Sequence, residues 1–239
     1  EEGLLFAFDD MDDLYKVKFV NGGYETVQSL DVNEKEEYVS QGSGSLQVNY
    51  HKGEKPKIMI HKENLLMPDL DYLSLKTISV DIFNPQRRDV NITINLIKSG
   101  KNVICSQTAV ADGQVWSTIE FPINAVVMNY SAESVIGVML EFDVAIEASY
   151  YVDNMRVELG NAISEEDKAY ITEIEKLTQD INELPAKLTL EDESKLMELV
   201  NRYEAIPSEY RGAVSNYDVL NNAVLNYVSV AMEAEKTED

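Results

Sequence analysis

The chain has 239 residues, a hydrophobic content of 44% and a formal net charge of −23. This composition is typical of one large or two smaller globular domains and argues against disorder. Because such a charge repels phosphate backbones and anionic lipids, nucleic acid is not an expected partner. No apolar run reaches the roughly 18–20 residues of a membrane span, so membrane insertion is not expected either.

Short alternating runs of apolar and polar residues, separated by Gly, Asn, Asp and Pro, fill the sequence before Gly160. They include the stretches GSLQVNY, KIMIHK, LKTISVDIFNP, RDVNITINLIKSG, NVICSQTAVADG, QVWSTIEFPI and ESVIGVMLEFDV. Strands at this spacing, with no helical period between them, predict an antiparallel β-sandwich over residues 1–160.

The run YYVDNMRVELG, residues 150–160, predicts a further strand that carries a charge on its apolar face. Strict alternation places Tyr151, Asp153, Met155, Val157 and Leu159 toward the core and Tyr150 outward. Burial of an unpaired carboxylate costs several kcal/mol, so Asp153 should have a partner. That partner is either a cation, a nearby Arg or Lys, or a set of backbone N–H groups.

The pattern becomes helical after Gly160, which predicts a second domain over residues 161–239. Three apolar stripes at helical spacing indicate three helices that bury one another in a small bundle. The stripes are Ile171, Ile174, Leu177, Ile181 and Leu184; then Leu196, Leu199, Val200 and Tyr203; and finally Leu220, Ala223, Val224, Tyr227, Val228 and Ala231. Acidic first turns after Ser164 and Thr189 are typical of helix starts, and Pro185 ends the first helix.

The first 160 residues resemble the galactose-binding-like jelly rolls found in many carbohydrate-binding modules. The resemblance is carried, in order, by LLFAFDD, SQGSGSLQVNY, WSTIEFPI and YYVDNMRVEL. It implies a structural calcium ion held by Asp9, by the Gly42–Gly44 turn and by Asp153, which hard oxygen ligands would suit. Strict alternation favours Asp10 over Asp9 as the ligand from the first strand; a β-bulge would restore Asp9.

Residues 161–239 resemble the FIVAR-like helical repeats of large bacterial surface proteins. The stretch INELPAKLTLEDESKLMELVNRYEAIPSEYRGAVSNYDVLNNA carries this pattern. The resemblance implies a spacer or interaction domain in a secreted or cell wall-associated bacterial protein, with neighbouring domains of the same chain as partners.

Candidate sugar-stacking residues are the aromatic side chains in or beside predicted loops, because glycan sites combine aromatic faces with hydrogen-bonding groups. Trp116 lies opposite Ile119 and Phe121 by alternation and either faces a groove or packs at a sheet edge. The others are Tyr24, Tyr38, Tyr72 and Tyr130.

Catalysis finds little support in the sequence. His51 and His61 lack an evident third metal ligand. Cys105 lies in a predicted strand and is interpreted as an unreactive thiol in the core. No phosphate-cradling loop, nucleophile elbow or Cys–His signature is present. The expected function is therefore a non-catalytic glycan-binding module with a helical spacer; the alternative is a structural stalk or adhesin segment that binds no glycan.

Overall fold

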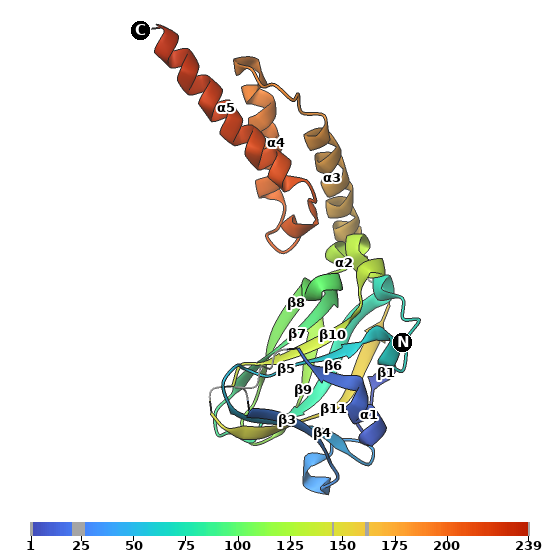
Figure 1. Cartoon of the computed structure of the whole chain (residues 1–239). Helices are drawn as coiled ribbons and strands as arrows, with labels where there is room; N and C mark the ends of the chain where they lie inside the picture. Colours follow the sequence, from blue (N-terminus) through green and yellow to red (C-terminus); the bar gives the residue numbers. More distant parts are fainter. Residues whose placement is uncertain (1, 21–26, 145, 161–162, 239) are drawn as a thin grey trace. The chain divides into compact units, whose positions relative to one another are not determined.

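The computed structural model describes residues 2–20, 27–144, 146–160 and 163–238. The chain divides into two compact units, residues 1–162 and 163–239, and this division lies two residues from the predicted one. The first unit is a sandwich of two antiparallel sheets and the second consists of helices, so the predicted class is confirmed (Figure 1). Within the described ranges, no helix is long and apolar enough to span a membrane.

The first sheet, sheet A, has six strands with β11 near its centre. Five of them are, in spatial order, β3 (Val27–Asn33), β4 (Ser45–Lys52), β11 (Ala148–Leu159), β6 (Leu75–Phe83) and β9 (Trp116–Pro122), and the sixth is β1 (Glu2–Phe6). The first half of β11 pairs with β4, and its second half pairs with β1, where Glu2 lies opposite Glu158. Sheet A therefore joins the first and last strands of the sandwich.

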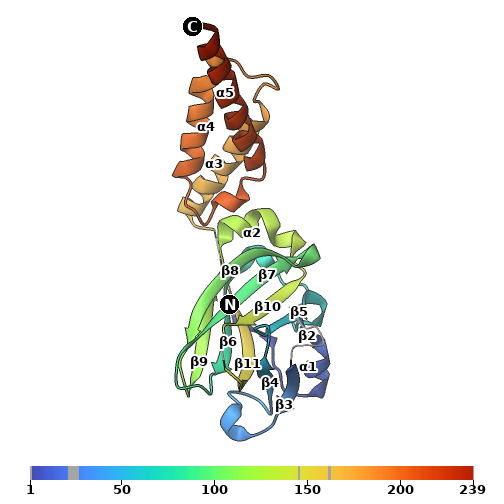
Figure 2. The same cartoon turned by 60° about the vertical axis from the view of Figure 1, so that its left-hand side comes forward.

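The second sheet, sheet B, has five strands and covers the other side of the core (Figure 2). Its order is β2 (Val17–Phe19), β5 (Lys57–His61), β10 (Gly137–Phe142), β7 (Val90–Lys98) and β8 (Asn102–Ala111). Two short helices that the sequence pattern did not predict, α1 (Met11–Lys16) and α2 (Ala125–Ser131), connect strands.

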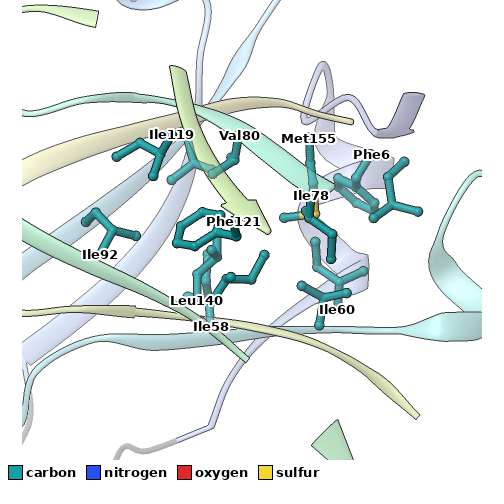
Figure 3. Packing of buried hydrophobic residues seen from close by; sticks show 14 of the residues in the cluster. Phe6, Ile58, Ile60, Ile78, Val80, Ile92, Ile119, Phe121, Leu140 and Met155 are labelled. Atoms are coloured by element: carbon teal, nitrogen blue, oxygen red, sulfur yellow. The ribbon is translucent and has the colours of Figure 1, made fainter. Parts of the chain in front are cut away.

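The core lies between the sheets and is built from the apolar positions of the alternating strands. Figure 3 shows Phe6, Ile78, Val80, Ile119, Phe121 and Met155 from sheet A facing Ile58, Ile60, Ile92 and Leu140 from sheet B. Each of these side chains is at most 2% exposed. In β10 the predicted alternation is confirmed for Val138, Leu140 and Phe142, because all three belong to this core.

A bulge in β11 corrects the predicted faces of its first half. Asn154 has φ of 50°, and the pairing of β11 with β6 shifts between Asp153 and Arg156. This extra residue reverses the alternation, so Tyr150 and Val152 lie in the core with Met155 and Val157. The prediction that Tyr151 and Asp153 face the core, and Tyr150 the outside, was therefore wrong.

The helical unit contains α3 (Glu165–Asn182), α4 (Glu193–Ala205) and α5 (Tyr217–Glu238). Ser164 and Asp167 form a capping box at the start of α3, as the acidic first turn suggested. The stripe residues Ile174, Leu177, Ile181, Leu196, Leu199 and Leu220 are buried. Val228, however, is 48% exposed, so the apolar pattern of α5 extends beyond the face that packs on α3 and α4.

Candidate functional site

Asp153 lies on the outer face of sheet A, yet only 1% of it is exposed. Loop 34–44, which joins β3 to β4, covers it. One carboxylate oxygen, Oδ2, accepts hydrogen bonds from the Ser40 amide (2.8 Å), the Ser40 hydroxyl (3.0 Å) and the Gln41 amide (2.9 Å). The other oxygen, Oδ1, is buried without a hydrogen-bond partner in the described part of the chain. Burial raises the pKa of this carboxyl group, against the opposing effect of these hydrogen bonds.

Asp9 contacts the far end of the same loop. Its Oδ1 accepts hydrogen bonds from the amides of Ser43 (2.9 Å) and Gly44 (3.3 Å). Gly42 has φ of 78°, and a Cβ added there would lie 2.2 Å from Asp9 Oδ1. Only glycine allows the loop to approach the carboxylate this closely.

Asp10 has a different role from the one that strict alternation suggested. Its Oδ1 accepts hydrogen bonds from the amides of Asp12 (2.8 Å) and Asp13 (3.0 Å), and so caps α1. The pairing of β1 shifts between Leu4 and Phe6, and Phe8 has φ of 67°. These irregularities turn Asp9, rather than Asp10, toward loop 34–44.

A pocket of about 150 Å³ lies between the two carboxylates. Its lining residues are Leu4, Ala7, Asp9, Gln41, Gly42, Asp153 and Asn154. The described residues contain no group of three or more His, Cys, Asp or Glu side chains placed to hold a metal. Any cation here would therefore be held by two carboxylates together with neutral oxygens.

Asp81, which lies opposite Asp153 on β6, extends this polar network across the sheet. Its Oδ2 accepts a hydrogen bond from the Asn154 amide group (3.0 Å) and lies 2.8 Å from the Ser40 hydroxyl oxygen, whose single hydrogen it shares with Asp153. Its Oδ1 accepts from the Thr118 hydroxyl (2.7 Å) and the Arg156 guanidinium (3.2 Å). Arg156, the nearby cationic side chain, is thus paired with Asp81. The partners of Asp153 among the described residues are two backbone amides and a hydroxyl group.

A row of aromatic side chains crosses the same outer face two residues away. Tyr151, Phe83 and Trp116 lie opposite one another on β11, β6 and β9. From loop 34–44, Tyr38 stacks on Tyr151 with ring centroids 4.2 Å apart and an interplanar angle of 2°. The Trp116 indole N–H donates to the Glu37 carbonyl oxygen over 3.3 Å. The loop is therefore held by aromatic contacts at one end and by carboxylates at the other.

Tyr38 and Tyr151 also form one wall of an open pocket of about 350 Å³. The remaining lining residues are Pro85, Gln86, Ile146, Glu147, Ala148 and Ser149. Glu147 makes a 2.7 Å contact with His51 Nδ1. Aromatic rings next to carboxylate, amide and hydroxyl groups are the combination that binds sugars.

The other aromatic candidates are scattered. Tyr24 lies outside the described residues. Tyr72 is 7% exposed and belongs to the core, where burial raises its pKa to about 12, so it has no free ring face for a sugar. Tyr130 is 40% exposed on α2. Among the candidates in the described part of the chain, Tyr38 and Trp116 share a neighbour, because the ring of each contacts Phe83.

Sequence reasoning missed Tyr151, Phe83 and Asp81. Phe83 and Asp81 share the outer face of the run LKTISVDIFNP, opposite Ile78, Val80 and Ile82. That alternation was visible in the sequence, but their neighbours on β9 and β11 depend on strand register, which the sequence does not specify.

No protein-family model matches this chain, and no match was found among the curated proteins. Solved structures with a similar arrangement include a family 11 carbohydrate-binding module from Clostridium thermocellum in complex with a β-1,3-1,4-mixed-linked tetrasaccharide. It is 14% identical, has a TM-score of 0.45, and the alignment covers 65% of this chain and 94% of that one.

Two further structures are of the same kind. A xylan-binding family 22 module from Paenibacillus barcinonensis is 14% identical with a TM-score of 0.43, over 66% of this chain and 94% of that one. A family 27 module from Caldicellulosiruptor saccharolyticus in complex with mannohexaose is 11% identical with a TM-score of 0.47, and the alignment covers 66% of this chain and 97% of that one.

Proposed function

We propose that the sandwich is a non-catalytic glycan-binding module whose site is the pocket beside Tyr38 and Tyr151. The observation that carries this proposal is the position of two stacked tyrosine rings against an open pocket that also presents Glu147, Ser149 and Gln86. A pyranose ring has an apolar face that packs on an aromatic ring and hydroxyl groups that pair with such polar neighbours. Trp116 supports the site by holding loop 34–44.

The parent protein in this proposal is secreted or attached to the wall of a bacterial cell, and the helical unit acts as a spacer or contacts neighbouring domains. Glycan polymers are found outside the cell, and the strongly acidic surface suits a ligand without phosphate groups. The resemblance of the helices to FIVAR-like repeats motivates the spacer role.

A structural Ca²⁺ ion belongs to the same proposal. Asp9 and Asp153 would hold it with main-chain oxygens from the end of β1 and from the Gly42–Gly44 turn. Asp153 Oδ1, buried and without a partner in the described structure, supports this fit, because a cation would satisfy it. When bound, the ion supplies positive charge between two carboxylates and links loop 34–44 to β1 and β11.

The alternative function is a structural stalk segment that binds no glycan. It is favoured by one observation: Tyr38 covers a face of Tyr151, so part of the aromatic surface is used within the protein itself.

Affinity electrophoresis in gels that contain mixed-linkage glucan, xylan or mannan, with calcium present, tests the proposal. We expect one of these neutral polymers to retard the wild-type protein and Tyr38→Ala to remove the retardation. Tyr15→Ala is the matched control, because Tyr15 is 67% exposed on α1 in the same unit. No retardation in any gel, confirmed on a broad glycan array, would favour the stalk.

A further inference from the structure

A ring of polar side chains continues from the proposed pocket toward the edge of sheet A. Two residues that line the pocket, Ser149 and Tyr151, lie opposite Asn49 and Gln47 on β4. Those two lie opposite Ser29 and Asp31 on β3. Because adjacent strands are about 4.8 Å apart, the two rows extend roughly 10 Å beyond β11 on the same face.

Asn49 organises this ring and uses its full hydrogen-bonding capacity to do so. Its amide nitrogen donates to the Ser29 hydroxyl (2.9 Å) and to Asp31 Oδ2 (2.7 Å). Its amide oxygen accepts from the Gln47 amide (2.7 Å) and the Ser149 hydroxyl (2.6 Å). Asn49 is only 8% exposed. It therefore fixes the orientation of four polar groups around it.

The outward-facing groups of this ring are mainly hydrogen-bond acceptors. Ser29 and Asp31 are exposed, and Gln47 and Ser149 are half-buried. Since Ser149 and one Gln47 hydrogen already donate to Asn49, the remaining capacity is largely that of the Asp31 carboxylate, the Gln47 carbonyl and the Ser149 oxygen. Glu147 adds a second carboxylate at the pocket. Such a surface suits a ligand rich in hydroxyl donors and repels one that carries carboxylates or sulfates.

We propose that the ring around Asn49 is a second subsite, so that the bound glycan is a neutral oligosaccharide running from the Tyr38–Tyr151 pocket across β4 to β3. This inference rests on the proposed glycan-binding function. Within it, Tyr38 provides stacking at the first subsite, Asp31 and Gln47 contact the next sugar units, and Asn49 is a positioning residue.

Calorimetric titration of the full chain with cello-, xylo- and manno-oligosaccharides of about one to six units tests the inference. For the class that binds, affinity should rise at least about tenfold between the shortest and a four-unit ligand, as one charge-assisted hydrogen bond would give. Asn49→Ala and Asp31→Asn should each remove most of this rise and leave the affinity for the shortest ligand unchanged. Oligogalacturonate, an anionic chain of the same length, should bind more weakly.

Thr93→Ala is the control, because Thr93 makes a comparable side-chain hydrogen bond (2.7 Å to Thr108) on sheet B. Asp31→Asn keeps the test valid if Asn49→Ala fails to fold, since Asp31 is exposed. A wild-type affinity that does not grow with ligand length would overturn the second subsite while leaving the glycan-binding function intact. The same conclusion follows if the affinity of both variants grows as much with length as that of the wild type. Absence of binding at every length would overturn both.

Discussion

Replacement of Asp153 by alanine separates two contributions that this side chain makes to the free energy of unfolding. The first is the set of three hydrogen bonds to Ser40 and Gln41, which the carboxylate accepts at 2.8–3.0 Å. Removing the acceptor leaves the backbone amides of Ser40 and Gln41, in loop 34–44, without this partner, at a cost of about 1–3 kcal/mol each. We therefore expect the variant to lose about 3 kcal/mol of unfolding free energy in the presence of a chelator.

The second contribution is the proposed calcium ion. At a free calcium concentration about 100-fold above its dissociation constant, binding to the native state alone adds roughly 2.7 kcal/mol to the wild type and nothing to the variant. The difference between the two proteins should therefore widen from about 3 to about 6 kcal/mol when calcium replaces chelator.

Urea unfolding followed by tryptophan fluorescence measures both values. Trp116 is the only tryptophan of the chain and lies in the sandwich, against loop 34–44, so its emission reports on the unit that contains the site. A difference that stays the same with calcium and with chelator refutes the calcium assignment. A variant as stable as the wild type in chelator refutes the energetic role given to the hydrogen bonds.

Three other measurements probe the same unit and its boundary. In chelator, wild-type stability should fall as pH rises from about 3.8 through the raised pKa of Asp153 in the folded state, because the folded state then binds more protons than the unfolded one. Asp153→Asn should lack this fall, and identical pH profiles for the two proteins would contradict the raised pKa. Trp116→Ala should cost about 2 kcal/mol through lost packing together with the lost hydrogen bond to Glu37, and Trp116→Phe about 1 kcal/mol through the lost hydrogen bond, measured by calorimetric melting; a Trp116→Phe variant as stable as the wild type would show that the N–H contributes nothing. Limited proteolysis should cut near residues 160–164 and release two pieces, each with its own melting transition; pieces that unfold on separation would indicate a shared core.

The fold could be predicted from the sequence wherever a strand or helix keeps its period. In the run from Val138 to Phe142, the alternating residues Val138, Leu140 and Phe142 belong to the core between the sheets, as their spacing predicts. In α3, Ile174, Leu177 and Ile181 keep helical spacing, and all three are fully buried.

The candidate site lies where those periods break, and for that reason it was less predictable. The bulge at Asn154 places Tyr151 and Asp153 outside, although counting by twos places them inside. The irregular end of β1 turns Asp9 toward the loop, where counting favours Asp10. A bulge leaves little trace in a single sequence, because positive φ is uncommon even for Asn, although Asn is enriched there over most other residues.

The pairing of Glu2 with Glu158 also has a consequence for how the sandwich folds. β11 lies between β6 on one side and β4 and β1 on the other, so the central strand of sheet A is the last strand of the sandwich to leave the ribosome. Until then, β4 and β6 have no partner along the edges that β11 will fill, and such open edges invite pairing with other chains. Contacts between residues this far apart in sequence also form slowly. A nascent chain that stops before Ala148 should therefore remain dependent on chaperones, whereas twelve further residues complete sheet A.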